Sequence, residues 1–172
     1  IEVNCAYQNN FGFLRRILSF FHFGVAAFIV GLFGKYSIIY ASSTPLTVGL
    51  VGAFIKVFRS KKLVFEVRDL WPLLPHKMGI LKSKVFLTLL YWVEAGIYRY
   101  SDYIVTLAPG MNNNISELGV PEKKIFTVPN GCDLEVFKAS RKENCFDNAT
   151  DLKLIYAGTL GVANGLNFLV EV

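Results

Sequence analysis

Residues 63–72 are Leu-Val-Phe-Glu-Val-Arg-Asp-Leu-Trp-Pro, and this stretch decides the predicted fold. Its first five residues are apolar or β-branched apart from Glu66, a pattern typical of a buried strand in a parallel sheet. Arg68 and Asp69 follow directly, and Trp71 comes two residues later. In an open α/β sheet, ligands bind just outside the carboxyl ends of the strands. A charged pair and an aromatic side chain are therefore placed for chemistry, although a structural ion pair with a packing tryptophan fits the same residues.

Outward from this strand, the pattern alternates between strand and helix. Strands are predicted at residues 36–40, 63–67, 103–107 and 124–128, helices at 45–58, 82–100 and 110–118, and a loop at 75–79. Strands that alternate with helices of this length imply βαβ units with right-handed crossovers. The predicted fold class is therefore α/β, with a Rossmann-like parallel sheet.

Polar side chains near two of the predicted strand ends are further candidates for a site. Ser42, Ser43 and Thr44 follow the first strand, where we expect them to cap the next helix, although they are also placed to contact a ligand. His76 lies in the predicted loop after Trp71 and faces the expected cleft, so it is a candidate acid/base group.

The segment 17–34 contains no charged side chain other than the titratable His22, and Arg15, Arg16 and Lys35 flank it. Three alternatives fit an apolar run of this length: a membrane span, a helix in the membrane interface and a helix in the protein core. Basic residues at its start favour the interfacial helix, because they can reach the lipid headgroups. We therefore expect this segment to contact a membrane.

Composition restricts the possible partners. The net charge is +5, from 18 Lys and Arg against 13 Asp and Glu, which suits a phosphate-bearing ligand or an acidic membrane surface. A nucleic-acid partner is not expected, because no motif for one accompanies the charge. Cys5, Cys132 and Cys145 lack metal-ligand spacing and are interpreted as reduced thiols of a cytosolic protein. The chain opens on Ile1 and stops within a predicted helix, so we expect a fragment of a longer enzyme.

The last part of the sequence predicts the start of a second domain. Residues 138–151 are polar and mixed in charge, as in a linker, and 152–157 begin a new strand. A glycine-rich loop at 158–165 follows and lets backbone N–H groups approach a phosphate at a helix N-terminus, although an ordinary strand-to-helix turn fits too. Its spacing is not G-x-G-x-x-G, which disfavours a dehydrogenase. The predicted organisation is a first domain at 1–137, a linker at 138–151 and a second Rossmann-like domain from 152 to 172.

Three motifs in this order resemble glycosyltransferase family 4. They are Val-Arg-Asp-Leu-Trp-Pro at 67–72, Pro-Asn-Gly-Cys-Asp at 129–133 and Ala-Gly-Thr-Leu-Gly-Val-Ala-Asn-Gly-Leu at 157–166. The family is a retaining one with two facing Rossmann domains, the B-type glycosyltransferase fold. The motifs are most similar to the bacterial branch that adds N-acetylated amino sugars, such as N-acetylfucosamine, in O-antigen, lipopolysaccharide and capsule synthesis.

The resemblance implies that residues 1–137 are the later part of an acceptor-side domain and that the donor domain begins at 152. The donor would be a nucleotide sugar, usually a UDP sugar, and the acceptor a lipid-linked molecule or a growing glycan. The resemblance implies no metal and no other cofactor. It places the enzyme in the cytoplasm, peripheral on the inner face of the cell membrane.

The resemblance also assigns roles to residues. Asp69 and Arg68 would form the reaction centre. The residues near the donor phosphates would be Gly158, Thr159, Gly161, Asn164 and Gly165, and those that shape the cleft and hinge would be Asn130, Gly131, Trp71 and His76. Many relatives carry His in place of Arg68 and a cation in place of Thr159 or Asn164. Arg68 cannot act as a base, so it would stabilise phosphate charge or hold Asp69 in place.

Two other functions fit the sequence. A nucleotide-sugar epimerase of the same fold would convert the donor with no acceptor present. A non-catalytic membrane-associated subunit would bind membranes and partners without turning over a nucleotide sugar.

Overall fold

The structure is a computed structural model, and it describes residues 2–5, 11–43, 45–136 and 155–158 together with Asn164, Leu166 and Phe168. The chain divides into two compact units, Ile1–Asn130 and Gly131–Val172. The predicted linker and most of the predicted second domain lie outside the described residues, so the domain organisation stays a prediction.

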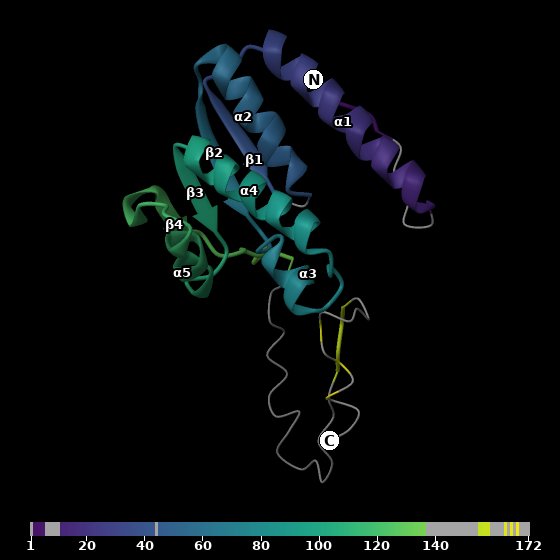
Figure 1. Ribbon diagram of the computed structural model, residues 1–172. Helices are drawn as coiled ribbons and strands as arrows, with labels where there is room; N and C mark the ends of the chain where they lie inside the picture. Colours follow the sequence, from purple (N-terminus) through teal and green to yellow (C-terminus); the bar gives the residue numbers. More distant parts are fainter. Residues whose placement is uncertain are drawn as a thin grey trace. The chain divides into compact units, whose positions relative to one another are not determined.

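The first unit is built on a four-stranded parallel sheet (Figure 1). Its strands, in spatial order, are β1 (Ile38–Ser42), β2 (Lys62–Val67), β3 (Tyr103–Thr106) and β4 (Ile125–Thr127). In the register of the sheet, Ala41 pairs with Phe65, which pairs with Ile104, which pairs with Ile125. The prediction of an α/β, Rossmann-like parallel sheet is confirmed.

The helices of the first unit are α1 (Phe13–Phe33), α2 (Thr47–Arg59), α3 (Leu73–Lys77), α4 (Lys84–Tyr100) and α5 (Gly110–Glu117), and a 3₁₀ turn spans Glu122–Lys124. The predicted loop at 75–79 is wrong in part, because α3 occupies its start. The N–H of Leu74 donates to the carbonyl of Leu70 at 2.8 Å, and that of His76 donates to Pro72 at 3.1 Å. Prolines tolerate this geometry at the first turn of a helix, where their missing N–H has no partner to lose.

The hydrophobic core lies between the sheet and the helices α2 and α4. Leu63, Phe65 and Val67 alternate along β2 and are fully buried against Ile97 of α4. Gly49 allows α2 to approach this layer closely, because a Cβ there would lie 2.7 Å from both Ile97 Cγ2 and Phe65 Cε2. The apolar run that predicted β2 therefore contains its fully buried face, which is made of every second residue.

Helix α1 packs against α2 through its C-terminal half. A Cβ on Gly31 would collide with the side chain of Ile55, and the rings of Phe28 and Phe58 meet edge to face at 5.9 Å. Figure 1 shows the two helices close together at their C-terminal ends and diverging toward their N-terminal ends. Among the described residues, no helix has the length and apolar character that crossing a membrane requires.

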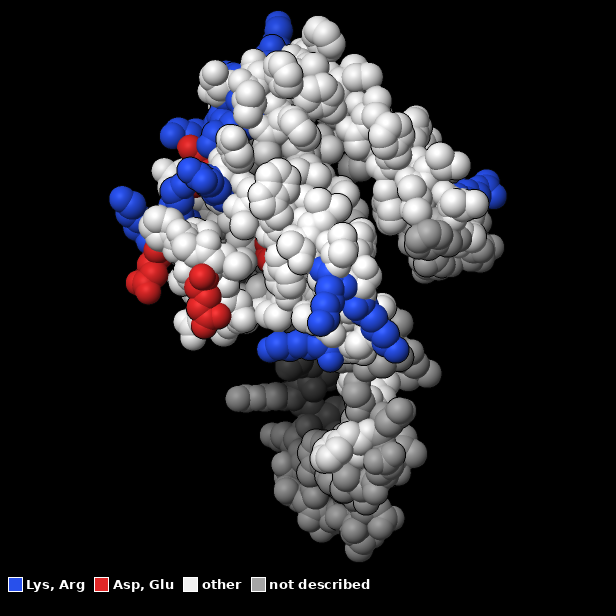
Figure 2. All heavy atoms as spheres, viewed as in Figure 1, with Lys and Arg blue, Asp and Glu red and all other residues white. Residues whose placement is uncertain are grey.

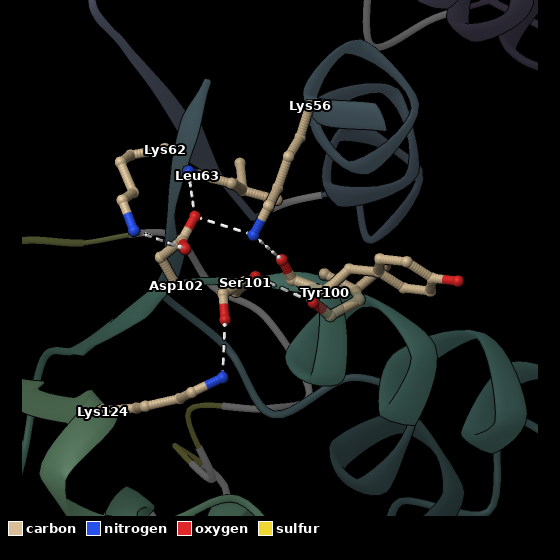
Figure 3. Close-up of polar contacts among 8 residues, drawn as sticks. Lys56, Lys62, Leu63, Tyr100, Ser101, Asp102 and Lys124 are labelled. Atoms are coloured by element: carbon tan, nitrogen blue, oxygen red, sulfur yellow. Dashed lines mark hydrogen bonds and ion pairs between the residues drawn. The ribbon is translucent and has the colours of Figure 1, made fainter. Parts of the chain in front are cut away.

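A charged cluster ties the amino edge of the sheet together (Figure 3). Asp102, directly before β3, accepts hydrogen bonds from Lys56 Nζ at 2.7 Å, Lys62 Nζ at 3.3 Å and the N–H of Leu63 at 2.8 Å. Partial burial acts to raise the pKa of Asp102, but the hydrogen bonds from Lys56, Leu63 and Lys62 outweigh it and lower the pKa to about 2. This carboxylate therefore links α2, β2 and the start of β3 through hydrogen bonds.

The same edge receives one further cation. Lys124 Nζ donates to the carbonyl of Ser101 at 3.2 Å, next to Asp102 (Figure 3). The amino edge is thus a structural junction, which leaves the opposite edge for ligand chemistry.

Candidate functional site

Two serines at the end of β1 bond to the end of β2. The hydroxyl of Ser42 donates to the carboxylate of Glu66, and the hydroxyl of the buried Ser43 accepts from the N–H of Arg68 at 2.9 Å. The prediction that these serines cap the next helix is wrong, because β1 extends to Ser42 and α2 begins later, with Leu46 at its N-cap and no side-chain cap. The third predicted capping residue, Thr44, lies outside the described residues.

Glu66 and Arg68 form an ion pair at this carboxyl edge. Arg68 Nη1 lies 4.0 Å from Glu66 Oε2, and the side chain of Glu66 is 13% exposed against 48% for Arg68. Both residues alternate with the core residues of β2, so they lie on the other face of the sheet. One side of the guanidinium therefore faces the Glu66 carboxylate, and about half of the Arg68 side chain is exposed.

Tyr40 of β1 lies on the same face, two residues before Ser42. Burial and the neighbouring Glu66 carboxylate raise the pKa of the Tyr40 hydroxyl, and Arg68 acts in the opposite direction. Sequence reasoning missed Tyr40 as part of this group. The available signal was Glu66, the one charged residue in the apolar core of that strand, which requires polar neighbours on its face.

Asp69 follows Arg68 and is exposed at the carboxyl edge of β2. Its carbonyl accepts a hydrogen bond from the N–H of Trp71 at 3.0 Å, and the bond between Trp71 and the buried Pro72 is cis. Trp71 is half-buried and packs against the core, so the structure favours the packing role for this aromatic. This turn places the exposed Asp69 at the end of the strand.

His76 belongs to α3 and is exposed. Its Nδ1 lies 3.3 Å from the hydroxyl of Tyr91 on α4, and the two rings meet edge to face at 6.3 Å. Burial and the neighbouring Glu94 raise the pKa of Tyr91. His76 therefore has an orienting partner, which the sequence did not reveal.

A second cluster of hydrogen-bonded polar side chains lies at the carboxyl ends of β3 and β4. The hydroxyl of the buried Thr106 donates to Asn112 Oδ1 at 2.7 Å, and Asn112 Nδ2 donates to the Thr127 hydroxyl at 3.0 Å. Sequence reasoning missed this group, because its partners are brought together only by the packing of α5 on the sheet. The exposed Asn130 lies three residues beyond Thr127, at the same edge as Asp69.

The predicted donor loop belongs to the second unit. Gly131 and Gly158 are exposed, and Asn164 is exposed within a single turn. The predicted phosphate-binding residues Thr159, Gly161 and Gly165 lie outside the described residues. The donor loop therefore stays a prediction.

The arrangement in the first unit offers a small set of chemical functions. A solvent-facing carboxylate, Asp69, can accept a hydrogen bond or a proton from a hydroxyl. The adjacent guanidinium of Arg68 is always charged and can donate several hydrogen bonds to phosphate oxygens. Within the described part of the chain, no group of three His, Cys, Asp or Glu side chains could hold a metal ion.

Comparisons with known proteins give one family and one group of similar structures. Residues 3–136 match the family model described as Glycosyltransferase Family 4. The fold is similar to crystal structures of the Anabaena protein HepE. For its complex with UDP-glucose, the identity is 16% and the TM-score 0.48, over 70% of this chain and 29% of that chain. For its complex with UDP and glucose, the identity is 17% and the TM-score 0.49, over 77% of this chain and 32% of that chain.

This chain therefore spans less than a third of the length of the solved structures that it resembles. No curated protein matches the sequence.

Proposed function

The chain belongs to glycosyltransferase family 4, and we propose that it is part of an enzyme that moves a sugar from a nucleotide-sugar donor to a lipid-linked or glycan acceptor, with retention at the anomeric carbon. The supporting observation is the family match itself, which covers residues 3–136 and so includes the edge that carries Arg68 and Asp69. The donor in this proposal is a UDP-linked N-acetyl amino sugar.

In the proposed reaction, the Asp69 carboxylate accepts a hydrogen bond from the reacting hydroxyl, orients it and takes up its proton as the nucleotide diphosphate departs. Arg68 donates to the diphosphate that departs with the nucleotide, where negative charge develops in the transition state. Its ion pair with Glu66 limits the positions that the guanidinium can take. Binding energy is then used for the reaction rather than for ordering a long side chain.

The remaining binding roles rest on the family pattern. We assign the diphosphate to the backbone of the loop 158–165, and we assign Asn130, Gly131, Trp71 and His76 to the walls and hinge of the cleft. No metal takes part in this scheme, because Arg68 and backbone N–H groups supply the positive charge.

The proposal also includes a cellular setting. We place the enzyme peripherally on the inner face of a bacterial cell membrane, in the synthesis of surface polysaccharide. Support comes from α1, whose apolar side chains are exposed along its length, Leu14, Phe21 and Phe33 among them. Exposed apolar area of this extent indicates an interaction surface.

Product stereochemistry tests the retaining part of this proposal. The full-length protein, given an α-linked nucleotide sugar and acceptor, is expected to form an α-glycoside. Proton NMR of the first product measures this through the coupling constant of the anomeric proton. A β-linked first product would contradict retention while leaving sugar transfer in place.

A further inference from the structure

An apolar groove opens between the N-terminal halves of α1 and α2. Its volume is about 670 Å³. Among its lining residues are Ile17, Phe21 and Val25 of α1 and Val48, Val51 and Phe54 of α2. Figure 2 shows this region as a hollow between α1 and the body of the unit, bordered on the visible face by uncharged residues.

The groove results from how the two helices are joined. Gly31 and the ring pair Phe28–Phe58 hold their C-terminal halves in contact. Farther back, a Cβ on Gly24 would lie 3.6 Å from Val51 Cγ2, and from there toward the N-termini the helices diverge. Large side chains line the open part but do not fill it, and Phe21 remains 70% exposed. A surface of this kind is unfavourable in water and needs an apolar occupant.

The position of the groove relates it to the candidate site. A crossover helix of a parallel sheet runs antiparallel to the strands, so its N-terminus lies at the edge where the strands end. Pro45 lines the groove, and it is two residues from Ser43, whose hydroxyl accepts from the N–H of Arg68. The mouth of the groove is therefore at the same edge as Arg68 and Asp69.

The charge around the groove indicates the chemistry of its occupant. Between Glu2 and Glu66 the sequence has no acidic residue. Of the basic residues in this segment, Arg15 lies two residues before Ile17, which lines the groove, whereas Lys56, Arg59 and Lys62 lie at the opposite, amino edge of the sheet. Arg68 lies at the edge where the groove opens. An apolar groove with Arg15 and Arg68 near its open end and no acidic residue from 3 to 65 is complementary to a molecule with a hydrocarbon chain and an anionic head.

We propose that the α1–α2 groove binds the hydrocarbon chain of a lipid-linked acceptor, whose phosphate-bearing head places the acceptor sugar at the Arg68–Asp69 edge. This inference rests on the proposed function and narrows it, because it selects a lipid-linked acceptor over a free glycan. It also gives the exposed face of α1 a role in holding substrate.

The test uses the full-length protein and a long-chain alkyl phosphate that carries a photoreactive diazirine at the end of its chain. After irradiation, mass spectrometry of peptides is expected to find the label on residues of α1 and α2 that line the groove. Unlabelled alkyl phosphate should compete for labelling, and inorganic phosphate should not. Label on another surface, or competition by inorganic phosphate alone, would overturn the proposal.

Two groove variants and one control sharpen this result. Phe21→Glu places a charge in the groove, and Val25→Trp fills it without charge, so both are expected to reduce labelling by about tenfold or more. Leu118→Glu introduces the same charge at an exposed apolar residue away from the groove, at the end of α5. This variant should be labelled like the wild type. Equal labelling of the wild type and the three variants would contradict the proposal. A wild-type dimer in which the second copy fills the groove, and which dissociates in Phe21→Glu, would also contradict it.

Kinetics separate this proposal from the proposed function. In Phe21→Glu, the KM for a lipid-linked acceptor is expected to rise about tenfold, while kcat at saturation changes little. This pattern is expected because the groove would bind the acceptor equally well in the ground state and in the transition state. If the wild type transfers no sugar to any acceptor, the proposed function fails, and the labelling experiment still decides whether the groove binds a hydrocarbon chain. If transfer to free glycans is as efficient as transfer to lipid-linked ones, the lipid proposal alone fails.

Discussion

Asp69→Asn is expected to lower kcat for sugar transfer by about 10²- to 10⁴-fold, the usual contribution of a side chain that accepts a proton or a hydrogen bond in the transition state. The substitution keeps the shape of the side chain but removes its charge and its capacity to accept a proton. Asp69 is exposed at the end of β2, so the fold should tolerate the change. Initial rates of nucleotide release with both substrates at saturation measure the effect.

A matched control guards against a general effect of charge. Glu122→Gln removes a carboxylate that is exposed in the 3₁₀ turn before β4. Its kcat should equal that of the wild type within about twofold, since surface substitutions away from special features have small effects. If Asp69→Asn were as active as this control, Asp69 would not belong to the reaction centre.

Glu94→Gln is expected to raise the free energy of unfolding by roughly 3 kcal/mol at pH 8 and to change it little near pH 4. Glu94 is 3% exposed and accepts a hydrogen bond from the hydroxyl of Tyr98 at 2.9 Å. Burial raises the pKa of Glu94 from its ordinary value of 4.5 to about 7, against the opposing effect of the Tyr98 hydrogen bond. The folded protein therefore carries a carboxyl group that resists ionisation.

The sign of the pH dependence follows from this raised pKa. Below about pH 4.5, both folded and unfolded states hold the proton, and the group has no effect on stability. As the pH rises toward 7, the unfolded state releases its proton first, so the wild type loses stability across this window and no further above it. Glutamine keeps an oxygen that accepts from Tyr98 and has no proton to release.

Urea unfolding of the wild type and Glu94→Gln across this pH range measures the difference. The two stability curves should converge at low pH and separate as the pH rises, with the variant more stable. Parallel curves would mean that Glu94 ionises in the folded state as readily as in water. Tyr98→Phe serves as a control, because it removes the hydrogen bond and leaves the buried carboxyl in place.

The sequence predicted the features of the fold that depend on local pattern. Residues 63–67 of β2 are apolar apart from Glu66, and the structure fully buries every second one, Leu63, Phe65 and Val67. The position of Arg68 and Asp69 at the end of this strand followed from the same pattern. In contrast, Ser42 and Ser43 were predicted to cap a helix because hydroxyl residues before a helix usually do so. Their real partners, Glu66 and the N–H of Arg68, lie on the neighbouring strand.

The missed parts of the candidate site share this non-local origin. Tyr40 joins Glu66 only because β1 and β2 pair in a particular register. Thr106 and Asn112 meet because α5 packs at the end of β3. Pattern along a single chain contains the period of each element but not the register between elements, so such groups cannot be identified in advance.

The segment 17–34 shows the same limit on a larger scale. Its sequence left three alternatives open, because a uniformly apolar helix has no face that indicates its partner. The structure shows that one face of the helix packs on α2, because Gly24 and Gly31 lie directly against Val51 and Ile55. The rest of the helix stays exposed, and the groove beside it is the basis for the lipid proposal.

The most direct test of the central proposal, sugar transfer from a nucleotide donor, measures nucleotide release by the full-length protein. UDP-, GDP- and dTDP-sugars are each supplied with and without membrane lipid extract as the source of acceptor. We expect one nucleotide to be released, and only when acceptor lipid is present. Conversion of a donor without acceptor would indicate an epimerase. No release from any donor, with membrane binding intact, would contradict the transferase proposal and leave a non-catalytic subunit in its place.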